Sequence, residues 1–303
     1  MRKIILSTVM TYLVITVFAQ EHQTLTYYQN DSIQLEMDLF LPETSNISKH
    51  PLVLFVHGGG FSGGNRTGGL SYCRYLAQNG YAAATISYTL YMRGKNFSCG
   101  GVTSEKVKAM QYAANDLWSA TAYLIDHADQ LAIDTQKIFV TGSSAGAETV
   151  LHAQYWNRSV MGWSGDPLPK GFKYKGLISG AGAIMDLNMI QKDNLIPMML
   201  FHGSNDRTVP YGTAAHHYCP TDATGWLMFF GSHSIYEHIN SLGATSQLYT
   251  YCGGGHELSA ELFKRDFDLS LDFLNQVLSN QKSQKHIIIK TDKPNTGATT
   301  LCD

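Results

Sequence analysis

Charge is scarce in this sequence. Of its 303 residues, 22 are basic and 24 are acidic, so charged residues make up 15% of the chain and the formal net charge is −2. An ordinary soluble domain carries about 25% charged residues. Because the chain has no basic surplus to neutralise a phosphate backbone, we expect no nucleic-acid partner. The five cysteines are also too few for a disulfide-stabilised scaffold in a chain of this length.

Apolar residues, by contrast, are plentiful. Hydrophobic residues make up 44% and aromatic residues 11% of the chain, which excludes an intrinsically disordered protein. The length is enough for one large α/β domain, or for two small domains, with a well-buried core.

The first nineteen residues differ from the rest of the chain. Arg2 and Lys3 precede an apolar stretch over 4–18, and the small side chains of Val17 and Ala19 come just before Gln20. This is the three-part pattern of a secretory signal peptide. A transmembrane anchor is the alternative, but it needs about 20 apolar residues and this stretch is shorter. We therefore predict a signal peptide over 1–19, a secreted or periplasmic protein, and no stable membrane insertion after cleavage.

Strand and helix patterns alternate after this leader. The run 52–56 is continuously apolar and ends at glycines, as expected for a strand buried on both faces. Similar strands are expected at 81–86, 137–140, 176–179, 198–201 and 247–251, with shorter alternating ones at 25–29 and 34–40. Helices are expected at 70–79, 105–128, 147–155, 234–242 and 257–278. The alternation predicts an α/β domain over 20–280 with a mostly parallel central sheet of about eight strands and helices on both faces.

Other parts of the chain show no regular pattern. Three insertions, 91–104, 157–174 and 212–231, are either binding loops or surface excursions. The tail over 281–303 is polar apart from 287–289, and it is either a disordered end or an added strand.

The motif Gly142-Ser143-Ser144-Ala145-Gly146 carries the strongest functional pattern. It follows an expected strand and precedes an expected helix, which is the context of a nucleophile elbow. Such a turn exposes the hydroxyl of Ser144 above the sheet edge. The flanking glycines are needed because a Cβ at either position would strike a neighbouring element.

A second motif, His57-Gly58-Gly59-Gly60, follows the strand over 52–56. A glycine-rich turn presents backbone N–H groups without side-chain obstruction. With the N–H of Ala145 it can hold an oxyanion. A tight loop without a ligand and a phosphate-binding turn are the alternatives.

A serine nucleophile needs a base, and the base needs an orienting carboxylate. In this type of site the chain order is serine, acid, histidine. Asp206 follows the expected strand over 198–201, and His256 follows the next one. Both lie just past the carboxyl ends of strands, where open α/β sheets place their sites. We therefore predict that Ser144, Asp206 and His256 meet.

Competing candidates fit less well. Asp193 precedes its strand and Asp222 lies in an insertion. Glu148 is expected to pack on its helix, Asp116 to be a structural hydrogen-bonding residue, and His202 to be a packed histidine. His57 belongs to the glycine turn. The remaining candidates are expected at the surface: His216, His217, His233 and His238.

Together the motifs resemble the α/β-hydrolase family, in particular its esterase and lipase branch with a His-Gly-Gly-Gly turn, which includes exported bacterial carboxylesterases and carbohydrate esterases. The likeness runs from about Gln34 to Leu278. It implies Ser144 as nucleophile, His256 as general base and acid, and Asp206 as the orienting acid, with no cofactor and no metal. The oxyanion hole would be formed by Gly59, Gly60 and Ala145. We further place Phe61, Tyr211 and Trp226 in the substrate pocket.

The resemblance also leads to expectations about substrate and cysteines. A lipase-type N-terminal lid is not evident, which favours small or soluble esters, including acetyl or feruloyl groups on polysaccharides. A serine peptidase of the same fold and a non-catalytic binding protein are the alternatives. The positions of the loops in this fold favour disulfides between Cys73 and Cys99 and between Cys219 and Cys252, with Cys302 left over.

Overall fold

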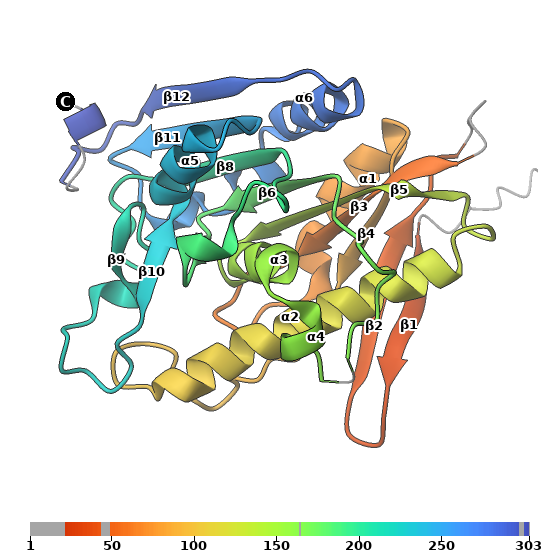
Figure 1. Cartoon of the computed structure of the whole chain (residues 1–303), viewed down its shortest axis with the longest axis horizontal. Coiled ribbons are helices and arrows are strands. Elements are labelled where there is room, and N and C mark those ends of the chain that lie inside the picture. The colour runs from red at the N-terminus through yellow and green to blue at the C-terminus, as the bar shows by residue number, and fades with distance from the viewer. Residues whose placement is uncertain (1–21, 44–48, 164, 297–299, 303) are drawn as a thin grey trace, which may run out of the picture.

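A computed structural model describes residues 22–43, 49–163, 165–296 and 300–302 (Figure 1). The predicted signal peptide over 1–19 lies outside the described residues. Within them the chain forms a nine-stranded sheet in the order β1-β2-β4-β3-β5-β6-β8-β11-β12. The strands are β1 (Gln23–Gln29), β2 (Gln34–Phe40), β3 (His50–Val56), β4 (Ala82–Ile86), β5 (Ile133–Ser143), β6 (Gly176–Gly180), β8 (Met198–Gly203), β11 (Ser246–Cys252) and β12 (Gln284–Lys290).

The sheet is mostly parallel, as predicted. β1 pairs antiparallel with β2, and β2 pairs antiparallel with β4, while every other neighbouring pair is parallel. The ninth strand, β12, comes from the tail and pairs with β11 along its whole length. Of the two alternatives for the tail, 284–290 is therefore an added strand. Lys285 and Lys290 on this edge strand discourage pairing with another chain.

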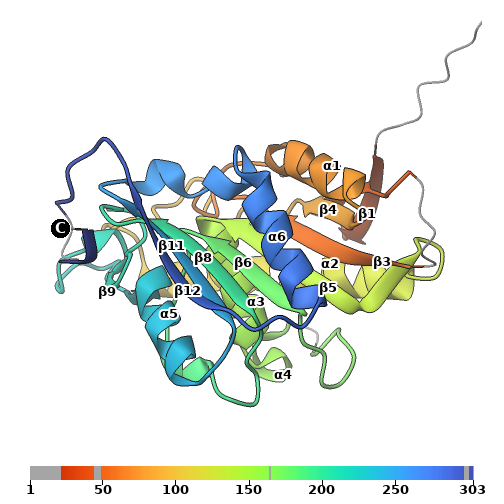
Figure 2. The same cartoon turned by 90° about the horizontal axis from the view of Figure 1, so that it is seen from above.

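Helices cover both faces of the sheet (Figure 2). They are α1 (Leu70–Gln78), α2 (Thr103–Asp126), α3 (Ala145–Tyr155), α4 (Arg158–Met161), α5 (Ser232–Ser241) and α6 (Phe267–Leu278). Successive residues of β3 pack alternately against the helices on one face of the sheet and those on the other. Leu52 and Leu54 pack with α2, α3 and α5, whereas Val53 and Phe55 pack with α1 and α6. This double burial is why the strand is a continuous apolar run.

Two expectations about regular elements are wrong. The helix expected over 257–278 begins only at Phe267, because His256–Leu258 and Glu261–Phe263 form separate 3₁₀ turns where the chain crosses the sheet edge. The insertion over 212–231 is not irregular throughout. It supplies β9 (Thr213–Ala215), the 3₁₀ turn His216–Tyr218 and β10 (Met228–Gly231). β10 pairs with β9 on one side and with β7 (Ala183–Ile184) on the other, which forms a small second sheet.

The predicted disulfides are also wrong. Cys99 pairs with Cys219, and Cys252 pairs with Cys302, while Cys73 is a free thiol on the buried face of α1. The first bond forms because the insertions 91–104 and 212–231 meet in space. The second forms because β12 runs beside β11 and returns the tail to that strand's end. In the described ranges, no helix combines the length and apolar character needed to cross a membrane.

Candidate active site

Ser144 occupies the sharp turn between β5 and α3. Its backbone has φ 53° and ψ −124°, a conformation that a residue with a side chain adopts only under strain. A Cβ on Gly142 would lie 2.4 Å from the carbonyl oxygen of Gly146, and a Cβ on Gly146 would lie 2.0 Å from that of Val56. Both glycines are therefore sterically required, and the turn has the form of a nucleophile elbow.

The structure brings the three predicted polar residues together at this turn. Nδ1 of His256 lies 2.6 Å from Oδ2 of Asp206. A carboxylate only accepts hydrogen bonds, so Nδ1 carries the proton and Nε2 is the acceptor. The hydroxyl of Ser144 donates to that Nε2 at 2.7 Å. Oδ1 of Asp206 accepts the backbone N–H groups of Thr208 and Val209, at 2.7 and 3.0 Å, which fixes the carboxylate.

His202 is a second imidazole on the same carboxylate. It is fully buried, and its Nε2 lies 3.2 Å from both Oδ2 of Asp206 and the carbonyl oxygen of Val209. Both partners accept, so this nitrogen donates. Nδ1 of His202 lies 2.9 Å from the hydroxyl of Ser232. His202 is thus the packed histidine that the sequence predicts, and it additionally orients the acid, a contact that sequence reasoning missed.

These contacts perturb both titratable groups. Burial alone would raise the pKa of Asp206, but the hydrogen bonds and charges of His202 and His256 outweigh burial and hold its pKa well below the usual range. Burial lowers the pKa of His256, but the hydrogen bond and charge of Asp206 raise it by more. The pKa of His256 therefore lies above its ordinary value of 6.5.

A pH profile tests this assignment. His256 can accept the proton of Ser144 only as the neutral imidazole, so any reaction at Ser144 is expected to gain rate as the pH rises. Because the pKa of His256 is raised, half-maximal kcat/KM should fall above pH 6.5. The measurement is kcat/KM for a soluble ester between about pH 5 and pH 9. A midpoint well below 6.5 would contradict the predicted contact with Asp206.

The glycine turn lies against the nucleophile. A Cβ on Gly58 would approach the Cβ of Ser144 to 3.1 Å. Gly59 and Gly60 have φ of 121° and 59°, which glycine adopts most readily. Within the described residues their backbone N–H groups have no acceptor, and both glycines border the same cavity as Ala145. The oxyanion hole formed by Gly59, Gly60 and Ala145 remains a prediction, and this geometry is compatible with it.

A cavity of about 640 Å³ opens at Ser144. Phe61, Tyr211 and Trp226 do not line it, so the predicted pocket is wrong. Phe61 is buried against Tyr88 and Phe97, Tyr211 is buried with its hydroxyl 2.6 Å from that of Thr250, and Trp226 lies elsewhere, half-buried. The apolar lining comes instead from Phe55, Phe97, Ala145, Val209, Ala260 and Phe263.

Comparison with known proteins identifies the fold. The model of the BD-FAE family matches residues 37–161. Esterase 2 of the planctomycete Thermogutta terrifontis is similar in three solved forms. Its butyrate-bound form is 17% identical, with 86% of this chain and 95% of that chain covered and a TM-score of 0.59. The propionate-bound form is 18% identical, with 86% of this chain and 96% of that chain covered and a TM-score of 0.58. The form phosphorylated by paraoxon is also 18% identical, with 86% of this chain and 95% of that chain covered and a TM-score of 0.59. This chain has the α/β-hydrolase fold. Among curated proteins, none matches the sequence.

Several polar residues beside Ser144 were not predicted as site residues. His216 was expected at the surface, but it is 1% exposed and borders the cavity together with Glu148 and His217. Their placement depends on how the insertion folds back, for which the sequence has no local signal. In the parts of the chain that are described, no group of three or more His, Cys, Asp or Glu is arranged to hold a metal ion.

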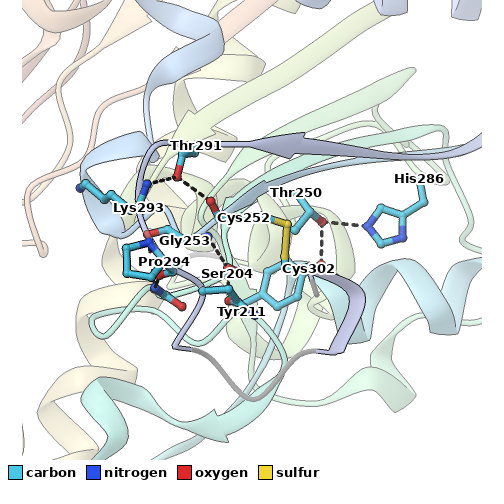
Figure 3. Close-up of a disulfide and its surroundings, with 12 residues drawn as sticks. Ser204, Tyr211, Thr250, Cys252, Gly253, His286, Thr291, Lys293, Pro294 and Cys302 are labelled. Atoms are coloured by element: carbon cyan, nitrogen blue, oxygen red, sulfur yellow. Dashed lines mark hydrogen bonds between the residues drawn. A yellow bond between two sulfur atoms is a disulfide. The ribbon is translucent and has the colours of Figure 1, made fainter.

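The C-terminal tail links the loop that carries Asp206 to the loop that carries His256 (Figure 3). The hydroxyl of Ser204 accepts the N–H of Gly253 and donates to Oδ1 of Asn295, both at 2.9 Å. The side chain of Asn205 donates to the carbonyl oxygen of Pro294 at 2.9 Å. Ser204 and Asn205 directly precede Asp206. The tail after β12 therefore holds the backbone on which two residues of the predicted triad depend.

The disulfide between Cys252 and Cys302 joins the tail to the end of β11, across a sequence separation of 50 residues. Replacing Cys302 by alanine is expected to lower the free energy of unfolding by about 2–4 kcal/mol, because a cross-link of this span restricts the unfolded chain. Ester turnover should fall less than tenfold, since the hydrogen bonds of the tail persist. Urea denaturation followed by fluorescence measures the first effect.

The free thiol of Cys73 provides a control for the loss of a cysteine. Cys73→Ala removes a buried sulfur but no cross-link. Both disulfides remain in this variant, so its denaturation midpoint should fall on reduction by as much as that of the wild-type protein. The midpoint of the wild-type protein should drop on reduction. Equal midpoints for Cys302→Ala and wild type would contradict a stabilising role of this disulfide.

Proposed function

We propose that this α/β-hydrolase is a serine esterase that cleaves small or carbohydrate-linked carboxylic esters through an acyl-enzyme. The observation that carries the proposal is the chain of short contacts from Asp206 through His256 to Ser144, at the mouth of a cavity. Asp206 fixes the tautomer of the imidazole, and the strained turn holds the hydroxyl out toward the cavity. Such an arrangement activates a serine for attack on a carbonyl carbon.

In the first half of the reaction, Oγ of Ser144 forms a bond to the ester carbonyl carbon while its proton moves to Nε2 of His256. The negative charge that develops on the carbonyl oxygen is held by the N–H groups of the glycine turn and of Ala145. The bond to the alcohol oxygen then breaks, and that oxygen takes the proton from His256. The imidazolium formed in between is stabilised by the carboxylate of Asp206.

In the second half, water replaces the alcohol. His256 accepts a proton from the water as its oxygen attacks the acyl carbon, and the second tetrahedral intermediate is held by the same donors. Its collapse breaks the bond to Oγ of Ser144, which recovers its proton from His256. The acid leaves, and no step requires a metal or a cofactor.

The acyl group that we propose is short or a feruloyl group. Support for a short acyl chain comes from the esterase of Thermogutta terrifontis, which has been solved with propionate and with butyrate bound. Support for acetyl or feruloyl esters of carbohydrates rests on the resemblance of the motifs to exported esterases. We also propose that the protein works outside the cytoplasm. Its two disulfides support this, because such bonds persist in oxidising compartments.

An ester and an amide of matched structure test the proposal. The purified protein should hydrolyse 4-nitrophenyl acetate and 4-nitrophenyl butyrate but leave 4-nitroacetanilide essentially uncleaved, which separates an esterase from a peptidase. Paraoxon should phosphorylate one serine per chain, and mass spectrometry should place the added diethylphosphoryl group on Ser144. A folded protein that neither reacts with paraoxon nor cleaves any ester would be a non-catalytic scaffold.

A further inference from the structure

A cluster of polar side chains borders the cavity on one side of Ser144. Glu148 lies one turn further along α3, and His216 and His217 lie on the 3₁₀ turn of the third insertion. Glu148 and His216 are each 1% exposed, so whatever these side chains contact must lie in the cavity or in the protein. The catalytic steps described above use none of the three.

The cluster does not satisfy its own hydrogen-bonding groups. Nε2 of His216 lies 3.1 Å from Oε1 of Glu148 but is not aligned for a hydrogen bond. Across the described residues, no hydrogen-bond partner is found for Oε1 of Glu148, for either ring nitrogen of His216, or for Nδ1 of His217. A buried polar atom without a partner costs about 1–3 kcal/mol. Such atoms, gathered beside a nucleophile, indicate a site whose partner is a ligand.

The two insertions hold this cluster rigidly. The disulfide between Cys99 and Cys219 links them, and the N–H of Gly225 donates to the carbonyl oxygen of Cys99 at 2.9 Å. The buried Nζ of Lys106 donates to the carbonyl oxygen of Gly225 at 2.5 Å. His217 and Tyr218 both have positive φ, 57° and 52°. Strained backbone that is fixed by a cross-link is typical of a preorganised binding site.

Chemistry limits what the cluster can bind. Burial and the nearby charges of His216 and Lys106 lower the pKa of His217 to about 4, so its ring is neutral near pH 7 and offers one donor and one acceptor. The carboxylate of Glu148 offers only acceptors. An anionic ligand would be repelled by this carboxylate, and an apolar ligand would leave the polar atoms without hydrogen bonds. A hydroxyl group fits, because it donates to a carboxylate and accepts from an imidazole N–H at the same time.

Phe97 supplies the apolar side of the same wall. Its ring meets those of His216 and His217 edge-on, with centroids 5.2 and 6.4 Å apart, and it lines the cavity. We infer that Glu148, His216 and His217 form a specificity subsite for a hydroxyl group carried on a ring of the ester substrate, with that ring placed against Phe97. The inference rests on the proposed esterase function and concerns which esters the enzyme prefers.

Two matched pairs of substrates test the subsite and show which half of the ester it reads. On the alcohol side, trans-2-hydroxycyclohexyl acetate is compared with cyclohexyl acetate. On the acyl side, methyl 4-hydroxycinnamate is compared with methyl cinnamate. In the wild-type enzyme one pair should show at least about a tenfold preference in kcat/KM for the hydroxylated member, since a subsite with unpaired polar atoms penalises the analogue that leaves them unpaired. The pair that shows it identifies a sugar-like alcohol or a phenolic acid as the source of the hydroxyl.

Three variants connect the preference to the cluster. Glu148→Met and His217→Phe should each reduce the ratio within that pair to near one, and Glu148→Gln, which keeps an acceptor, should retain part of it. Glu237→Gln, an exposed substitution on α5, should leave the ratio unchanged. If circular dichroism shows that the Glu148→Met protein is not folded, the test uses His217→Phe, because His217 is only half-buried.

The ratio separates recognition from general damage. A variant that only disturbs Ser144 or His256 lowers kcat/KM for both substrates of a pair by the same factor, so the ratio between them is unchanged. A wild-type ratio near one for both pairs, or a ratio that survives in both Glu148→Met and His217→Phe, would overturn the inference while leaving the esterase intact. If the enzyme hydrolysed none of the four esters and did not hydrolyse 4-nitrophenyl acetate either, the proposed function itself would be refuted.

Discussion

Replacing Ser144 by alanine is expected to lower kcat for 4-nitrophenyl acetate by at least about 10⁴-fold, with little change in stability. The variant loses the hydroxyl oxygen that lies 2.7 Å from Nε2 of His256, so no acyl-enzyme can form. The backbone turn at φ 53° is imposed by its surroundings, including the tight approaches at Gly142 and Gly146, and alanine can occupy it as serine does. The donors of the glycine turn remain, so a small residual rate over water should persist.

Ser143 offers the matched control for this prediction. It precedes Ser144 in β5 and also borders the cavity, so Ser143→Ala removes a neighbouring hydroxyl without touching His256. The Ser143→Ala protein should still be labelled by paraoxon, whereas the Ser144→Ala protein should not. Stopped assays and intact-protein mass spectrometry measure both results. Turnover of the Ser144→Ala protein within tenfold of the wild-type value would show that another residue is the nucleophile.

The parts of this protein that could be predicted from sequence are those in which a local pattern has a steric cause. The strand over 52–56 is continuously apolar because its residues face two cores in turn. The glycines around Ser144 are required by approaches of 2.0 and 2.4 Å. Asp206 and His256 could be found because the carboxyl ends of parallel strands share one edge, and chain order then leaves few alternatives.

The parts that could not be predicted depend on how distant loops meet. The pairing of Cys99 with Cys219 follows from two insertions coming together in space, and the same contact buries His216. Phe61 follows the glycine turn directly, yet its ring packs into the protein. The tail offered only the short apolar run 287–289, and its pairing with β11 depends on an edge that the sequence does not reveal.

Replacing Asp206 by asparagine is expected to lower kcat by about 10³- to 10⁴-fold, less than the loss of Ser144, because this residue orients the base and does not attack. The carboxylate receives donors on both oxygens: the N–H groups of Thr208 and Val209 on Oδ1, and the imidazoles of His202 and His256 on Oδ2. An amide has one oxygen for these two sets. If that oxygen keeps the backbone contacts, the NH₂ group of the asparagine faces Nε2 of His202 and Nδ1 of His256, which both carry protons, so donor faces donor.

This conflict has a specific consequence for His256. The imidazole can relieve it by moving its proton from Nδ1 to Nε2, and the nitrogen that faces Ser144 then cannot accept the hydroxyl proton. Loss of the negative charge also removes the contribution that raises the pKa of His256, so the residual activity should show an acid limb at lower pH than in the wild-type enzyme. Asp222→Asn, an exposed substitution in the third insertion, should change neither kcat nor the pH profile. A lower kcat with an unshifted acid limb would mean that Asp206 supports the loop and does not set the state of the histidine.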